Sequence, residues 1–149
     1  GELAGETPFD IPFTIKATQP TPNSSEDPIH PPFFGLSLSG PETHLQRRLE
    51  RESPERIALS LFHFSGNVLA RLLMKAQAEA PLPMVLHVGG VASNTLVRRV
   101  MDEAVTKALR KQKHLAPITL EYALPFYCSD NAVGTAALTV QALKRNASQ

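Results

Sequence analysis

The stretch Leu86-His87-Val88-Gly89-Gly90-Val91-Ala92-Ser93-Asn94 does most to decide the fold of this 149-residue chain. An apolar run, Met84–Val88, precedes the two glycines and a helical pattern follows them, which predicts a strand that turns directly into a helix. Glycine lets backbone approach a ligand closely, and the free N–H groups at a helix start favour an anion. An ordinary tight strand-to-helix turn has the same pattern, so the glycine pair alone does not separate the two interpretations.

A second junction, Tyr127-Cys128-Ser129-Asp130-Asn131-Ala132, follows the predicted strand Ile118–Leu124. Asp130 and Asn131 stand where a last helix, Asn131–Leu143, is expected to begin. A carboxylate and an amide at this place either cap the helix or reach outward to a metal or a ligand. The strand–helix–strand–helix order predicts a right-handed crossover and a parallel pair of strands.

Two amphipathic helices are expected ahead of and between these junctions. The longer one begins at Ser53-Pro54-Glu55, an N-cap, a first-turn proline and a favourable charge, and Pro81 and Pro83 end it. Its helical spacing predicts a well-buried helix with these apolar positions: Ile57, Leu61, Phe64, Val68, Leu72 and Ala76. The second helix has the following apolar positions: Leu96, Val97, Val100, Met101, Ala104, Val105 and Ala108. A short charged helix around Leu45 and Leu49 precedes both.

The first third of the chain is rich in proline. Apolar residues from Phe9 to Ile15 alternate with other residues, which is typical of a strand, although Pro12 would confine that strand to an edge or a bulge. Phe33–Ser39 is a second candidate strand, and we expect the two to pair across an irregular loop. We therefore divide the chain into residues 1–39, N-terminal strands with a Pro-rich loop at 17–32, and a core at 40–149.

Composition indicates a globular domain and little else. Hydrophobic residues make up 42% of the chain and charged residues 19%, and the net charge of +1 gives no global field for nucleic acid. No apolar run is expected to reach the ~20 residues that span a bilayer, and the first residues lack the pattern of a secretory signal. One cysteine cannot form an internal disulfide. We expect a cytoplasmic protein.

Both junctions match motifs of one family. "HVGGVASNTLVRR" and "YCSDNAVGTAAL" resemble the Gly-Gly-Val-x-x-Asn and Cys-(Thr/Ser)-Asp-Asn turns of the tRNA threonylcarbamoyladenosine transferases, also called O-sialoglycoprotein endopeptidases or glycoproteases. A third stretch, Gly35 to Thr43, is similar to the family's Phe-Ser-Phe-Ser-Gly-Leu-Lys-Thr. The three matches occur in the family's order and cover roughly Phe33 to Leu143.

The resemblance implies an α/β fold of the actin/Hsp70/sugar-kinase type, of which this chain would be part of one lobe, with a mixed sheet of about four strands packed with about four helices. In the family an activated threonylcarbamoyl-adenylate, made from ATP, lies between two lobes, and the acyl group passes to N6 of an adenosine in tRNA. A divalent metal (Fe or Zn) orients the acyl donor.

Residue by residue, the resemblance implies that Asp130 is a metal ligand and that Gly89, Gly90 and Asn94 bind the nucleotide. A cap of the following helix is the alternative for Asp130 and for Asn94. These further residues would line the cleft: Ser37, Ser39, Gly40, Ser129 and Asn131. Pro41-Glu42 departs from the family's Leu-Lys and reverses a charge, which puts an anion or tRNA contact there in doubt and suggests a divergent paralogue.

The chain has no His-x-x-x-His, which supplies two metal ligands in the family, and no Ser-Gly-Gly-His-Thr. We therefore expect a fragment or one half of a split protein, which lacks a complete active site and by itself binds neither the metal nor ATP or threonylcarbamoyl-adenylate tightly. Its partners would be the missing N-terminal lobe, tRNA, and a second copy or a paralogue, and not a membrane. A non-catalytic scaffold and a nucleotide-binding module of other function remain alternatives.

The remaining candidates favour structural roles. His63 is expected to be packed within an apolar helix stretch or to lie at its edge, His87 to precede the glycines with little part in binding, and Cys128 to be a small buried residue. Five arginines are interpreted as solvated helix faces, with a tRNA surface as the alternative: Arg47, Arg48, Arg51, Arg98 and Arg99. Neither a Gly-x-Ser-x-Gly elbow nor a His-Glu-x-x-His helix is present, so the sequence provides no mechanism for an endopeptidase.

Overall fold

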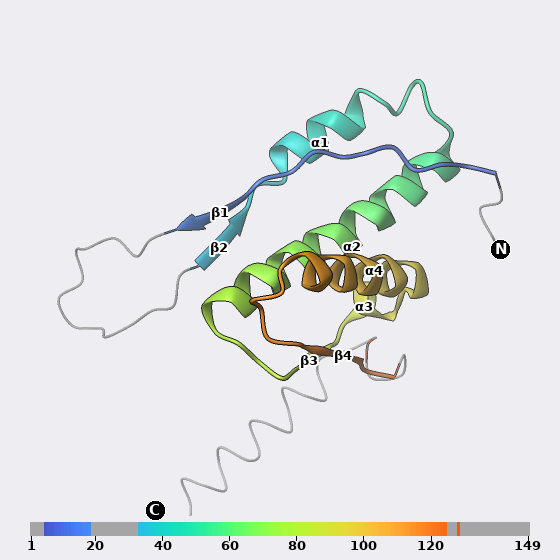
Figure 1. The fold of residues 1–149 in the computed structure, drawn as a ribbon. Coiled ribbons are helices and arrows are strands. Elements are labelled where there is room, and N and C mark those ends of the chain that lie inside the picture. Colours follow the sequence, from blue (N-terminus) through green and yellow to red (C-terminus); the bar gives the residue numbers. More distant parts are fainter. Residues whose placement is uncertain (1–4, 19–32, 125–127, 129–149) are drawn as a thin grey trace, which may run out of the picture.

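A computed structural model describes residues 5–18, 33–124 and 128 of the chain (Figure 1). Its elements in chain order are β1 (Ile15–Thr18), β2 (Phe33–Leu36), α1 (Ser39–Gln46), α2 (Pro54–Glu79), β3 (Met84–His87), α3 (Gly90–Ser93), α4 (Thr95–Lys111) and β4 (Thr119–Tyr122). The α/β class is confirmed. The predicted helix Asn131–Leu143 lies outside the described residues, and the division into residues 1–39 and 40–149 stays a prediction.

The four strands form two separate sheets of two strands each. β1 pairs with β2 antiparallel, with Ile15 opposite Leu36. A pairing across the Pro-rich loop is thus confirmed, but the first strand begins at Ile15, where the predicted one ends. β3 pairs with β4 in parallel, with His87 opposite Tyr122, as the strand–helix–strand order predicts. The single mixed sheet of four strands is therefore wrong for the described residues. An actin-like lobe is compatible with two separate sheets of two strands, but these sheets do not by themselves establish it.

The N-terminal segment ahead of β1 is extended but forms no ladder between residues 6 and 14. Its burial still alternates as predicted: Phe9, Ile11 and Ile15 are buried, and Asp10 and Pro12 between them are exposed. The segment is attached to α2 instead of to a strand. The Phe9 amide donates a hydrogen bond of 3.0 Å to the buried Ser60 hydroxyl, which in turn donates to the backbone of α2.

Helix α2 begins and ends where the sequence predicts. Ser53 is its N-cap, and the Ser53 hydroxyl accepts the Arg56 amide at 3.1 Å. The predicted buried face is largely wrong, however: of its positions only Val68 is buried, and Leu61 is exposed. The buried residues are Leu59, Ser60, Gly66, Val68, Ala70, Met74 and Gln77.

The buried stripe follows from the packing of α2 against α4. Gly66 lies so close to α4 that a Cβ atom built on it would be 2.8 Å from the Val100 side chain. Below this point Ala70 and Met74 join Met101 and Val105 in the core cluster. Small and linear side chains at these places let the two helix backbones approach, and the bulkier predicted residues lie to either side.

By length and composition alone α2 would also suffice to cross a membrane: its most apolar window has a mean hydropathy of 1.4, and a third of that window is buried. The expectation that no segment reaches this limit is therefore wrong. In the structure α2 packs against α4, and the Phe9 amide of the N-terminal segment hydrogen-bonds to Ser60 of α2.

Helix α4 confirms the amphipathic prediction, with Val97, Val100, Met101 and Val105 buried and a basic last turn. The C-terminal end of α2 is joined to the loops before β3 and β4 by the buried Gln77. Its amide donates to the Leu82 and Ala116 carbonyls at 3.1 and 3.2 Å, and its oxygen accepts the Leu82 amide. This side chain therefore ties together the two loops that lead into the strands of the parallel pair.

Candidate functional site

The glycine turn follows directly from β3. Gly89 has φ +101° and ψ 167°, a region that is open almost only to glycine. Among the described residues, a Cβ atom built on Gly89 or on Gly90 would meet nothing within 4 Å. The backbone of the turn therefore faces open space, as the close approach of a ligand would require.

The two glycines are followed by a short helix, α3, and not directly by the long helix that the sequence predicts. α3 spans four residues, and the chain breaks to an extended conformation at Asn94 before α4 begins. The Asn94 Oδ1 atom accepts the amides of Leu96 and Val97 at 2.9 and 3.2 Å, so Asn94 caps α4. Capping was one of its two predicted roles. Contact with a nucleotide stays a prediction.

Arg98 connects α3 to the residue that follows β4, whereas the second junction itself lies almost wholly outside the described residues. From the first turn of α4 its Nε atom donates to the Ala92 carbonyl of α3, and its Nη2 atom donates to the Ala123 carbonyl after β4 at 3.0 Å. The guanidinium also lies 4.8 Å from the centre of the Tyr122 ring. The interpretation of Arg98 as a solvated helix face is therefore wrong, because its donors are used within the fold.

Two aromatic side chains lie opposite each other at the ends of the parallel strands: His87, for which the sequence predicts little part in binding, and Tyr122, which sequence reasoning missed. The Tyr122 hydroxyl donates a 2.6 Å hydrogen bond to Asp102 of α4, and burial followed by this bond raises the pKa of Tyr122. The His87 ring stacks on Tyr122 at 5.5 Å, and burial lowers the pKa of His87 although the nearby Asp102 charge opposes this. Alternate residues of β4 are partly buried, and this pattern places Tyr122 on the inner face of the strand. Nothing in the sequence indicates that Asp102 of α4 is its hydrogen-bond partner.

The second junction is described only at its start. Cys128 is buried and donates to the Ala123 carbonyl at 3.5 Å, which confirms a structural thiol. Asp130 lies outside the described residues, as do Ser129 and Asn131. Within the part of the chain that the structure describes, no three His, Cys, Asp or Glu side chains come close enough to hold a metal.

The Ser-Gly segment is not brought to the glycine turn. The Ser37 and Ser39 hydroxyls hydrogen-bond to each other at 2.9 Å, and Gly40 lies in the exposed first turn of α1. Figure 1 shows α1 and α3 on opposite sides of α2. Pro41 is buried, and Glu42 stands in the first turn of α1, where a negative charge suits the helix dipole.

The other basic and imidazole candidates have structural surroundings. Arg48 pairs with Glu52 at 3.0 Å and lies 4.3 Å from the centre of the Phe9 ring, whereas Arg47, Arg51 and Arg99 are exposed. His63 is half-buried in α2, and burial, with the charge of Arg99 adding to it, lowers the pKa of His63. The predicted packed histidine is confirmed.

Comparison with known proteins supports the resemblance. The chain is 34% identical over 115 residues to the tRNA N6-adenosine threonylcarbamoyltransferase of Prochlorococcus marinus strain MIT 9215, and 35% identical over 115 residues to that of strain MIT 9515. Each alignment covers 70% of this chain and 30% of the relative, so the chain spans under a third of the length of these proteins. No family model and no solved structure matches the chain.

Proposed function

Because this chain is homologous over 70% of its length to part of the tRNA N6-adenosine threonylcarbamoyltransferases, we propose that it supplies the nucleotide side of such a transferase. The carrying observation is the glycine turn at the end of β3. An adenylate can approach the backbone closely where three features meet. These are a backbone angle that only glycine adopts easily, open space beside two glycines, and a parallel strand that ends at the same edge.

In this proposal Gly89 and Gly90 leave room for the phosphate side of ATP or of threonylcarbamoyl-adenylate, and the exposed backbone of the turn binds it. Asn94 would contact the nucleotide through the part of its amide that does not cap α4. Arg98 would not touch the ligand. It would hold the turn at a fixed distance from the end of β4, so that both junctions face one pocket.

Asp130 would be a ligand of the divalent metal, iron or zinc, which in the intact family protein polarises the acyl donor. A single carboxylate does not hold such an ion, and the described residues offer no cluster to complete it. The other ligands would come from the remaining lobe, in the same or a separate chain. Acyl transfer to tRNA, the cleft-lining roles of Ser129 and Asn131, and a cytoplasmic location belong to the same proposal.

A second candidate function is a non-catalytic scaffold. The observation that favours it is Glu42, which replaces a cationic position of the family motif and is well placed as a helix-dipole charge and not as an anion contact. In this case the chain pairs with a second copy or a paralogue and the glycine turn is structural only. A nucleotide-binding module with other chemistry differs from both in binding ATP without any transfer to tRNA.

Isothermal titration of the 149-residue chain with ATP tests the proposal. Gly90→Val places a branched side chain in the open space beside the turn, and Gly40→Val is the matched control, since Gly40 is equally open but lies on α1. We expect saturable binding that Gly90→Val weakens by about tenfold or more, the loss of ~1.4 kcal/mol, and that Gly40→Val leaves unchanged. Absence of ATP binding, or equal weakening by both variants, would exclude the nucleotide role and favour the scaffold.

A further inference from the structure

A groove of about 440 Å³ lies between the N-terminal segment, α2 and the second half of α4. Its floor is apolar and includes the buried Ala70 and Met74. None of the residues of the turn from Gly89 to Asn94 lines it. Its volume falls within the usual range of small-molecule sites, and nothing in the function proposed above uses it.

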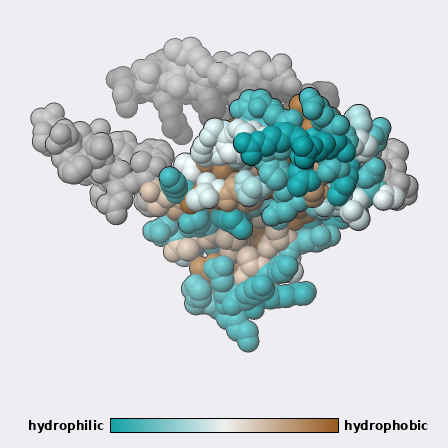
Figure 2. All heavy atoms as spheres, turned by 90° about the horizontal axis from the view of Figure 1, so that it is seen from above, coloured by the Kyte–Doolittle hydropathy of each residue, from teal (hydrophilic) through white to brown (hydrophobic). Residues whose placement is uncertain are grey.

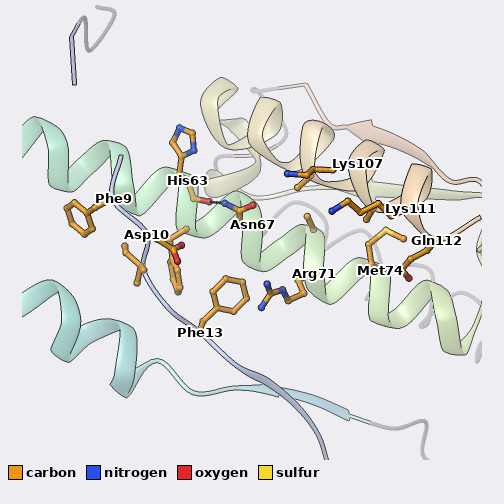
Figure 3. Close-up of a pocket in the computed structure, with 15 residues that line it drawn as sticks. Phe9, Asp10, Phe13, His63, Asn67, Arg71, Met74, Lys107, Lys111 and Gln112 are labelled. Atoms are coloured by element: carbon orange, nitrogen blue, oxygen red, sulfur yellow. Dashed lines mark hydrogen bonds between the residues drawn. The ribbon is translucent and has the colours of Figure 1, made fainter. Parts of the chain in front are cut away.

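Cationic side chains surround this floor (Figure 3). Lys107 and Lys111 of α4 point across the groove toward Asn67 of α2, and Arg71 lies on the side of the N-terminal segment. Asp10 is the one carboxylate among the residues that line the groove, against three cations. Within the described residues none of these three cations forms an ion pair with a carboxylate. Within the described residues the wall is therefore positive on balance.

One corner of the groove is aromatic. Phe13 meets Phe64 edge to face at 5.4 Å, and the Arg71 guanidinium stands 4.6 Å from the centre of the Phe13 ring. The corner is thus apolar, with a cation already placed over one of its rings. Figure 2, which looks down on the molecule from above, shows apolar side chains in the middle of the described part with hydrophilic ones around them.

We propose that this groove binds a small organic anion, one that carries a phosphate or carboxylate group on a flat apolar body. The body would lie on the Ala70–Met74 floor against Phe64, and the anionic group would meet Lys107 and Lys111. Neither part suffices alone: the lysines are solvated and weak for a bare ion, and the apolar floor gives an anionic group no partner.

Titration of the 149-residue chain with 2-naphthyl phosphate, followed by ¹H–¹⁵N correlation spectra, tests the proposal. Inorganic phosphate and 2-naphthol serve as the two halves of the probe, and 2-naphthoate distinguishes a carboxylate from a phosphate group. We expect saturable shifts at Asn67 and Ala108 with the whole probe and at least about tenfold weaker binding of either half, since each charge-assisted bond contributes on that order.

Lys107→Gln combined with Lys111→Gln should weaken binding of 2-naphthyl phosphate by about tenfold or more. Lys113→Gln is the control, because Lys113 is exposed just beyond α4 and lines none of the described grooves. All of these positions are exposed, so unchanged denaturation midpoints will show that the fold is retained. Equal affinity in the double variant and the control, shifts that phosphate alone reproduces, or no binding of the probe would each overturn the proposal.

Discussion

Arg98→Ala is the substitution whose effect follows most directly from the structure. The guanidinium donates to the Ala92 carbonyl of α3 and to the Ala123 carbonyl after β4, and it stacks on the Tyr122 ring. It is half-buried, so water replaces these contacts only in part. Truncation to alanine removes all three contacts together and leaves the two carbonyls with water alone.

The loss of folding stability in Arg98→Ala can be estimated from these three contacts. Each hydrogen bond contributes about 1 kcal/mol and somewhat more from a charged donor, and the cation–π contact contributes about 0.5–1 kcal/mol at a partly exposed site. The expected loss is therefore about 2–4 kcal/mol, a large part of the ~5–15 kcal/mol that stabilises an ordinary domain. Arg98→Lys keeps the charge but loses the planar fork, so we expect an intermediate loss.

Urea denaturation of the 149-residue chain, followed by circular dichroism, measures this loss. Arg99→Ala is the matched control, since Arg99 is the exposed next residue of the same helix and its removal should change stability by under about 0.5 kcal/mol. If Arg98→Ala falls within 0.5 kcal/mol of the control, a limit of the order expected for surface changes, Arg98 does not hold the junctions together and the reasoning is refuted.

Three further predictions concern the backbone and the pH dependence. Gly66→Ala should destabilise the chain in urea, because its methyl group would lie 2.8 Å from Val100 and overpacking costs ~1–3 kcal/mol, which exceeds the ~1 kcal/mol gain in helix propensity; a more stable variant would contradict this close approach. Gly89→Ala should cost ~1–3 kcal/mol at φ +101°, whereas Gly90→Ala, which has an ordinary φ and open space, should be near neutral; equal effects on the urea midpoint would contradict the strained turn. His63 has a lowered pKa in the folded chain, so near pH 6 the unfolded chain binds more protons and stability should fall as the pH drops through ~6.5; this loss should shrink in His63→Gln, and a His63 pKa at or above 6.5 by NMR titration would contradict the direction.

The sequence predicts the local elements of this fold well because their signals are local. Ser53 and the proline after it determine where α2 begins, and the apolar period of α4 determines its buried face. The parallel pairing of β3 with β4 follows from the helix between them. These features depend on residues that are near one another in the chain.

Prediction fails where a contact depends on distant residues. The buried face of α2 is set by how closely Gly66 approaches Val100, and a periodic pattern that counts only large apolar residues misses a glycine. Arg98 is charged and was therefore placed in solvent, yet two carbonyls and a ring from separate elements surround it. Asn94 is a third example, because the sequence could not distinguish a helix cap from a nucleotide contact. In the structure its amide oxygen caps α4.

The central claim is that the Gly89–Asn94 turn and the end of β4 form one adenylate-binding edge. Its most direct test is a ¹H–¹⁵N correlation titration of the 149-residue chain with ATP, with amide shifts assigned along the whole chain. The account predicts saturable shifts at Gly89, Gly90 and Ala123, whether or not the amides of the α2–α4 groove also shift. Shifts confined to that groove, or none at either junction under saturating ATP, would contradict it.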